Sequence, residues 1–333
     1  MIHNLYQQPM VVLHALPNKV LSLLDALLAS ALKERWRGEK IDRPIFIIGV
    51  ERSGTTLLYS LLANHPDLYW LSRLDSAIPG CPLFSSVIRR LVAFGMSRAI
   101  YVAIPGTISR SQGLMPPSEC LPYWRRIFGW GTEDNYLIPD DRFIEKHVTD
   151  DMRKHLYRDL RIRTNFSGKK RMLFKQPGLS LRTRFINDVF PDAIFLHVIR
   201  DPVANWLSLV GAKKSSRERF WGIKIPGWQQ LLQEPIEVQA ALQIQKTLEF
   251  IEYDVQEANA IGRYIQVRYE SLINHPQRTL NDCVRFCGLK WQNRLDKAIQ
   301  GVQAISRSDI LPENIPEEAK KILFLLREKY RYA

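Results

Sequence analysis

Two glycines and two threonines frame a short loop in the sequence GVERSGTTLL at residues 49–58. Gly49 and Gly54 have the spacing of the phosphate-binding loop G-x-x-x-x-G-K-[ST], but Thr55 stands where the lysine would stand. An apolar run typical of a buried strand precedes the loop, and a helical pattern follows it. This order places backbone N–H groups and the positive end of a helix around one anion. The loop therefore predicts an anion site whose ligand does not need the lysine that reaches the far phosphates of ATP.

Cationic side chains stand at the ends of two further runs that we predict to be strands. Lys175 ends the run RMLFK, and Arg200 ends the run FLHVIR. An enzyme of this build that uses Mg–ATP usually places an aspartate at such a strand end to hold the metal. Asp201 comes one residue later, in front of a proline, where it is predicted to cap the next helix. Together with Arg52 in the loop, these cations favour a nucleotide whose phosphate groups are neutralised by the protein without a metal.

Four segments resemble sulfotransferases that use 3′-phosphoadenosine-5′-phosphosulfate (PAPS). FIIGVERSGTTLLYSLLANHPDL resembles the 5′-phosphosulfate loop, in the branch with arginine in RSGTT that includes tyrosylprotein sulfotransferases and many bacterial enzymes. FLHVIRDPVANWLSL resembles the 3′-phosphate motif, and VRYESLINHPQRTLNDCVRFCGL resembles the later Tyr-Glu segment of that family. Between them, MLFKQPGLSLR is similar to a strand whose lysine lies near the transferred group. The segments follow one another in the family's order over about residues 44–290.

The resemblance implies roles for individual residues. The 5′-phosphosulfate would be bound by Arg52, Ser53, Gly54, Thr55 and Thr56. The 3′-phosphate would be held by Arg200 and Ser208, and Tyr269 would lie near the adenine. Arg52 and Lys175 would steady charge on the sulfuryl oxygens and on the departing phosphate. Ser306 and Arg307 could supply a late phosphate contact, although that stretch reads only as a polar loop.

The acceptor hydroxyl also needs a base within hydrogen-bond reach, and here the sequence departs from the family. The family often places a carboxylate in the segment after His-Pro, where this sequence has a serine and an arginine. Asp75 is the nearest acid and our first candidate. Glu119 is the second, because its apolar and aromatic neighbours in sequence could raise its pKa. His65 and His147 are weaker candidates, and His65 reads more simply as a helix-end residue.

Strand and helix patterns alternate along the chain, which predicts the α/β class: a P-loop-like parallel β-sheet flanked by helices. We expect a single sulfotransferase domain over 41–333 and an N-terminal amphipathic helical segment over 1–40. The stretch from about 72 to 153 is rich in Pro, Gly, Trp and Tyr and has few clean periods. We interpret it as an irregular insertion that shapes the acceptor pocket, with a structural cap as the alternative.

The N-terminal run VLSLLDALLASAL is too short to cross a bilayer and contains Asp25. A helix packed on the body is the favoured interpretation, while its basic end leaves open a peripheral contact with a membrane surface. The net charge of +13 calls for an anionic partner, but the basic residues are dispersed and no nucleic-acid motif accompanies them. We therefore expect no nucleic acid. The four cysteines are interpreted as small core residues of a reducing compartment.

The sequence thus predicts an enzyme that transfers a sulfuryl group from PAPS to a hydroxyl acceptor and releases adenosine 3′,5′-bisphosphate. No metal is expected. The acceptor would be a glycan, a lipid, another metabolite or a protein tyrosine, and its identity and the oligomeric state are not predicted. Because the chain does not open with a secretory signal, we expect a protein of the cytoplasm or of the cytoplasmic face of a membrane. The alternatives are a P-loop kinase that uses Mg–ATP and a non-catalytic basic protein that docks on a membrane or nucleic acid.

Overall fold

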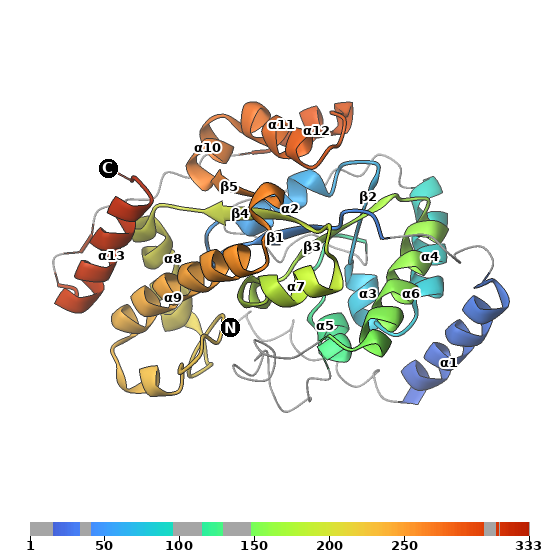
Figure 1. The fold of residues 1–333 in the computed structure, drawn as a ribbon, viewed down its shortest axis with the longest axis horizontal. Coiled ribbons are helices and arrows are strands. Elements are labelled where there is room, and N and C mark those ends of the chain that lie inside the picture. The colour runs from blue at the N-terminus through green and yellow to red at the C-terminus, as the bar shows by residue number, and fades with distance from the viewer. Residues whose placement is uncertain are drawn as a thin grey trace, which may run out of the picture.

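Five parallel strands form the sheet at the centre of the computed structural model (Figure 1). The structure describes residues 16–33, 41–95, 115–128, 148–302, 311–312 and 314–332. The strands are β1 (Ile45–Ile48), β2 (Leu68–Trp70), β3 (Arg171–Lys175), β4 (Ile194–Ile199) and β5 (Tyr264–Arg268). Their order in the sheet is β2-β3-β1-β4-β5. The α/β class and the parallel sheet predicted from the sequence are confirmed.

Side chains of the strands alternate between two buried faces, as the two-residue period of a strand requires. Phe46 of β1 lies on one face with aromatic residues of β3 and β4, where its ring centroid is 4.8 Å from that of Phe174. Ile45 and Ile47 lie on the other face with Leu196. Because helices cover both faces, the strands are continuous apolar runs rather than alternating ones. This is why they could be recognised in the sequence.

Two sets of helices cover these faces, and α10–α12 lie above the sheet in Figure 1 while α7 and α9 lie below it. The face with Phe46 packs on α5 (Leu121–Phe128), α6 (Asp150–Ser167), α7 (Thr183–Val189) and α9 (Ile236–Glu257). The face with Ile45 packs on α2 (Thr55–Leu62), α10 (Tyr269–Asn274), α11 (Pro276–Phe286) and α12 (Asn293–Ile299). A third apolar cluster joins α9 to α8 (Pro202–Ser215) and α13 (Glu317–Lys329). The helices therefore leave the carboxyl ends of the strands as the place for a site.

The N-terminal segment forms the predicted helix, α1 (Leu16–Ala31), which packs on α4 (Pro82–Gly95). Asp25 makes the connection: its carboxylate accepts hydrogen bonds from the backbone N–H of Leu83 at 3.2 Å and of Phe84 at 2.7 Å. These N–H groups belong to the first turn of α4, where no intrahelical acceptor exists. Among the described residues, no helix is both long and apolar enough to cross a membrane.

The stretch 72–153 is more regular than its composition predicts. Its described parts hold α3 (Arg73–Ala77), α4 and α5, and α6 begins within it, while 96–114 and 129–147 lie outside the described residues. A capping box starts α3: the Ser72 hydroxyl accepts from the backbone N–H of Asp75, and the Asp75 carboxylate accepts from that of Ser72. This S-x-x-D pattern was the local signal available in the sequence.

Candidate functional site

The loop after β1 occupies the point where the strand order changes direction. β1 pairs with β3 on one side and with β4 on the other. Lys175 is the last residue of β3, and Arg200 follows the last residue of β4. In parallel α/β sheets, ligands bind outside the carboxyl ends of the strands at such a switch point. The loop 49–54 and the two predicted cations therefore lie at the edge of the sheet where a ligand site is expected.

A side chain would not fit at either loop glycine, because neighbouring atoms lie too close and because both residues have a positive φ. Gly49 has φ +146°, and a Cβ there would lie 2.5 Å from the carbonyl oxygen of Val198 in β4. Gly54 has φ +101°, and a Cβ there would lie 2.2 Å from the ring of Tyr269. Ser180 pins the loop, accepting a 3.0 Å hydrogen bond from the backbone N–H of Gly49 and donating one of 2.9 Å to its carbonyl. The loop is thus fixed tightly against β4 and the start of α10.

Arg52 lies at the centre of one cluster of predicted residues. Its backbone has φ +67°, a left-handed conformation that is uncommon for a residue with a side chain. Its Nε donates a 3.0 Å hydrogen bond to Oγ of Ser208 in α8. Its carbonyl accepts a 3.1 Å hydrogen bond from Nη1 of Arg200, whose guanidinium lies 4.7 Å above the centre of the Tyr269 ring. Four residues predicted to bind the donor thus come together from three segments of the chain.

Lys175 lies at the centre of a second cluster, at the helix end of the loop. Its Nζ donates a 3.1 Å hydrogen bond to Oγ1 of Thr56, in the first turn of α2. The same ammonium forms an ion pair with the carboxylate of Glu119. The Lys175 side chain is only 4% exposed, whereas that of Glu119 is 47% exposed. A buried cation and a carboxylate accessible from solvent therefore stand side by side at the loop.

Two further loop residues are buried. Ser53 is 1% exposed and Thr55 is 6% exposed. No group among the described residues forms a hydrogen bond with the Ser53 hydroxyl. A buried hydroxyl that lacks a partner is uncommon in folded proteins, and it marks a place where a ligand oxygen could be bound.

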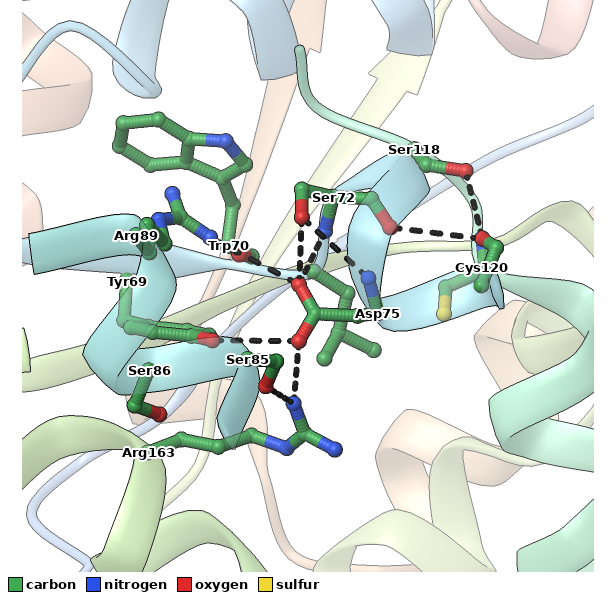
Figure 2. A network of polar contacts seen from close by, with 12 residues as sticks. Tyr69, Trp70, Ser72, Asp75, Ser85, Ser86, Arg89, Ser118, Cys120 and Arg163 are labelled. Carbon is green, nitrogen blue, oxygen red and sulfur yellow. Dashed lines mark hydrogen bonds and ion pairs between the residues drawn. The ribbon is translucent and has the colours of Figure 1, made fainter. Parts of the chain in front are cut away.

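Asp75 lies in a buried network of polar contacts (Figure 2). The carboxylate accepts 2.7 Å hydrogen bonds from the backbone N–H and the hydroxyl of Ser72. A third bond of 3.2 Å comes from the hydroxyl of Tyr69. Arg163 of α6 forms an ion pair with the same carboxylate, and Arg89 of α4 lies 3.7 Å from it. These contacts tie α3, α4 and α6 together around one buried charge.

The surroundings of Asp75 make it a weak base. The residue is 0% exposed. Burial acts to raise the pKa of Asp75, but Arg163, Arg89 and Ser72 together hold that pKa below its usual value. A base must instead reach the acceptor from an accessible position. Of the two acids selected from the sequence, Glu119 meets this requirement and Asp75 has a structural environment.

Of the two histidines considered as bases, His65 lies at a buried helix end and His147 lies outside the described residues. His65 is 0% exposed; its Nε2 lies 2.8 Å from the carbonyl oxygen of Lys290, and its Nδ1 accepts from the backbone N–H of Asp67. This agrees with its interpretation as a helix-end residue. His147, Ser306 and Arg307 lie outside the described residues.

Glu51 also belongs to the loop, although it was not among the candidate residues predicted from the sequence. It precedes Arg52, is 8% exposed, and its Oε1 lies close to Gly222, where an added Cβ would be 3.0 Å away. Burial raises the pKa of Glu51 to about 7, although a backbone N–H and Lys213 act in the opposite direction. An acid inside an anion-binding loop was itself the signal, because its charge would repel the ligand unless it is protonated or screened.

Possible metal ligands do not cluster in the part of the chain that the structure describes, and the cysteines form no disulfide. Within the described residues, no three His, Cys, Asp or Glu side chains gather as metal ligands would. All four cysteines are buried and unpaired. Asp201 caps α8 as predicted, with its carboxylate accepting from the backbone N–H of Val203 and Ala204 at 2.8 and 3.0 Å. That carboxylate is therefore already engaged by a helix end.

Two solved structures share the fold of this chain. Sulfotransferase STF9 from Mycobacterium avium superposes with a TM-score of 0.61 at 15% identity, over 92% of this chain and 81% of that one. Sulfotransferase STF1 from Mycobacterium tuberculosis gives a TM-score of 0.57 at 19% identity, over 85% of this chain and 76% of that one. At these identities the likeness concerns the fold.

Sequence comparison gives the family. Omega-hydroxy-beta-dihydromenaquinone-9 sulfotransferase Stf3 of Mycobacterium bovis is 25% identical over 258 residues, which cover 74% of this chain and 63% of that protein. Protein-tyrosine sulfotransferase A of Caenorhabditis elegans is 23% identical over 281 residues, covering 84% of this chain and 57% of that protein. The chain thus spans less than two thirds of the length of these relatives. A profile of the sulfotransferase family matches residues 44–293, well over half of the chain. This protein belongs to the sulfotransferase family.

Proposed function

We propose that this protein transfers a sulfuryl group from PAPS to a hydroxyl acceptor, without a metal, and releases adenosine 3′,5′-bisphosphate. The observation that carries the proposal is the meeting of three cations, Arg52, Lys175 and Arg200, at the carboxyl ends of β1, β3 and β4. Protein cations at this edge would neutralise the separate phosphate groups of such a donor. A cytoplasmic site of action stays a prediction from the sequence.

The residues present fit the donor. The 5′-phosphosulfate would be held by the loop backbone, by the unpartnered hydroxyl of Ser53 and by the hydroxyls of Thr55 and Thr56 at the start of α2. Arg200 and Ser208 would hold the 3′-phosphate, and both already contact Arg52. Gly54 allows the loop backbone to lie directly against the ring of Tyr269, because a Cβ at this position would collide with that ring. The site would therefore combine backbone and hydroxyl groups of the loop and of α2 with Arg200 and Ser208 from the segment after β4.

The chain's own residues would act mainly by positioning and by stabilising charge. Sulfuryl transfer resembles phosphoryl transfer in its loose transition state, for which these two effects dominate. The buried ammonium of Lys175, held by Thr56, would stabilise charge on the departing phosphate. Arg52, fixed by Ser208, would do so at the other end of the loop.

We assign the base to Glu119 in preference to Asp75. Glu119 lies beside Lys175 and is half exposed, so an acceptor hydroxyl arriving from solvent could donate its proton to it. The names of the two relatives mention an omega-hydroxy menaquinone derivative and a protein tyrosine, both of which present a hydroxyl. Our proposal for the acceptor is accordingly a hydroxyl group on a small molecule, lipid, glycan or protein tyrosine.

Isothermal titration with adenosine 3′,5′-bisphosphate in the presence of EDTA tests the donor site. We expect micromolar binding by the full chain and its loss in Arg200→Ala. Arg278→Ala, which changes an exposed arginine of α11, is the matched control and should bind like the unchanged protein. Absence of binding by the unchanged protein, or tight binding of Mg–ATP in its place, would contradict the proposal and favour a kinase.

A further inference from the structure

Helix α1 turns its small residues toward the protein and its large apolar residues toward solvent. Asp25 and Ala29 are 1% and 0% exposed, and both face the body of the protein. Leu23 and Leu27 are 62% and 59% exposed. The outward apolar residues are Val20, Leu21, Leu23, Leu24, Leu27 and Leu28. A helix that only packs on a globular body shows the opposite arrangement, with its larger apolar side chains buried.

Helix α4, on which α1 packs, adds further exposed apolar residues. Val87, Ile88 and Leu91 are 38%, 39% and 66% exposed. We call these three and the six outward residues of α1 the α1–α4 apolar face. It lies at one end of the molecule, and α13 lies at the opposite end (Figure 1). Contiguous exposed apolar surface on a protein marks a site of interaction with another surface.

The exposed charged residues in the ranges 20–33 and 82–92 are basic. Asp25 is the only acidic residue in 16–33 and 82–95, and it is buried against α4. The charged residues of these ranges that are exposed include Lys33 and Arg90, which are basic. The sequence that begins at the end of α1, KERWRGEK, has four basic residues and two acidic ones, and the whole chain carries +13. The partner that complements this surface is apolar inside and negatively charged outside.

We infer that the α1–α4 apolar face docks the protein on an anionic phospholipid bilayer, with α1 lying in the plane of the interface. The 16 residues of α1 are too few to cross the hydrocarbon core. A helix that presents apolar side chains on one face, beside basic residues, binds at the headgroup boundary. A second copy of this chain would bring charges of the same sign to the contact, whereas an anionic bilayer complements both the leucines and the basic residues. Anionic lipid attracts each such basic residue near the surface.

Vesicle flotation with the full chain tests this inference independently of sulfuryl transfer. One set of vesicles contains phosphatidylcholine alone, and the other contains phosphatidylcholine with phosphatidylglycerol. We expect the unchanged protein to float with the anionic vesicles and much less with the neutral ones. Leu23→Glu combined with Leu27→Glu should weaken partitioning at least about tenfold, since two apolar side chains that would enter the bilayer are replaced by two negative charges that the anionic lipid repels.

Phe324→Glu combined with Leu325→Glu is the matched control, because these side chains of α13 are exposed to a similar degree, 52% and 54%, at the other end of the molecule. This control should float like the unchanged protein. Far-UV circular dichroism and binding of adenosine 3′,5′-bisphosphate check that both double variants are folded. The inference fails if the unchanged protein stays in the aqueous fraction, or if both double variants lose flotation equally. It also fails if sedimentation shows a dimer that only the α1 variant dissociates, since a second copy would then cover the face.

Discussion

The guanidinium of Arg52 is fixed by a 3.0 Å hydrogen bond from its Nε to Oγ of Ser208, so the loop after β1 is tied to the helix after β4. The resemblance places the two residues in two different phosphate motifs, and the bond brings those two segments of the chain together. Since the carbonyl of Arg52 also accepts from Arg200, the loop and the strand end cannot move independently.

Replacement of Arg52 by lysine tests this connection. Lysine keeps the charge but lacks the planar guanidinium that can donate to Ser208 and to a ligand at once. We expect the affinity for adenosine 3′,5′-bisphosphate to fall about 10- to 100-fold, as expected for loss of a charged hydrogen bond. Titration calorimetry measures this change. An unchanged affinity in Arg52→Lys would show that only the charge at this position matters.

Gly54 can be tested through its contact with Tyr269. In Gly54→Ala the new Cβ would lie 2.2 Å from the tyrosine ring, at a backbone φ of +101° that alanine adopts poorly. We expect the free energy of unfolding to fall by about 1–3 kcal/mol, with weaker donor binding. Tyr269→Ala removes the ring but not the backbone strain at residue 54. Gly54→Ala should therefore cost less free energy of unfolding when it is made in Tyr269→Ala than when it is made in the unchanged protein. Urea unfolding of all four proteins gives the coupling, and its absence would count against the contact.

Asp75 is predicted to matter for stability. Asp75→Asn leaves Arg163 and Arg89 facing an uncharged group in a buried site. We expect a loss of about 3–5 kcal/mol in the free energy of unfolding. Asp282→Asn, at an exposed position of α11, is the control and should change stability by less than about 0.5 kcal/mol. Urea unfolding distinguishes the two, and equal stabilities would refute the structural role.

Glu119 is predicted to matter for turnover. Glu119→Gln keeps the size of the side chain but cannot accept the acceptor proton, so we expect kcat to fall about 10²- to 10⁴-fold. Affinity for adenosine 3′,5′-bisphosphate should stay within a few-fold, since Lys175 keeps its hydrogen bond to Thr56. The rate is measured with an acceptor identified by a screen with radiolabelled donor. Glu119→Asp, which retains a carboxylate, should keep part of the activity; equal rates in all three proteins would exclude the role of base.

Glu51 gives the stability of the protein a dependence on pH. Its ordinary pKa is 4.5, and in the folded protein burial raises that pKa to about 7. As the pH rises from 4.5 to 7, the unfolded chain therefore releases this proton before the folded protein does, and stability falls by up to about 3 kcal/mol. Glu51→Gln should remove the part of the decline that Glu51 causes and leave the part due to Asp254, whose pKa burial raises to about 6. Burial lowers the pKa of Lys213 to about 7. Titration of this lysine therefore changes the free energy of unfolding with pH only above about pH 7. Urea unfolding at pH 5 and pH 7 measures the difference, and parallel declines in both proteins would rule out Glu51 as the cause.

The sequence by itself determined the parallel sheet and the position of Lys175 and Arg200 at one edge of it. Strands buried on both faces are apolar throughout, so β1, β3 and β4 stand out from their surroundings. Residues at the carboxyl ends of adjacent parallel strands must lie at one edge, and for this reason Lys175 and Arg200 could be placed beside the loop. β2 has only three residues and was missed, because so short a run carries no measurable period.

Only the tertiary structure shows that Asp75 is enclosed and Glu119 accessible, which is the basis of our proposal for the base, and only the tertiary structure shows the direction of α1. Asp75 is nearer to the loop along the chain, but its carboxylate turns into the packing of α3, α4 and α6, where Arg163 meets it. Glu119 reaches Lys175 from a distant segment. In α1, the apolar residues lie on one face of the helix, but the sequence pattern alone does not say whether that face packs on the protein or stays exposed. The bond from Asp25 to the first turn of α4 makes that choice, because a buried carboxylate requires donors that only a partner helix supplies.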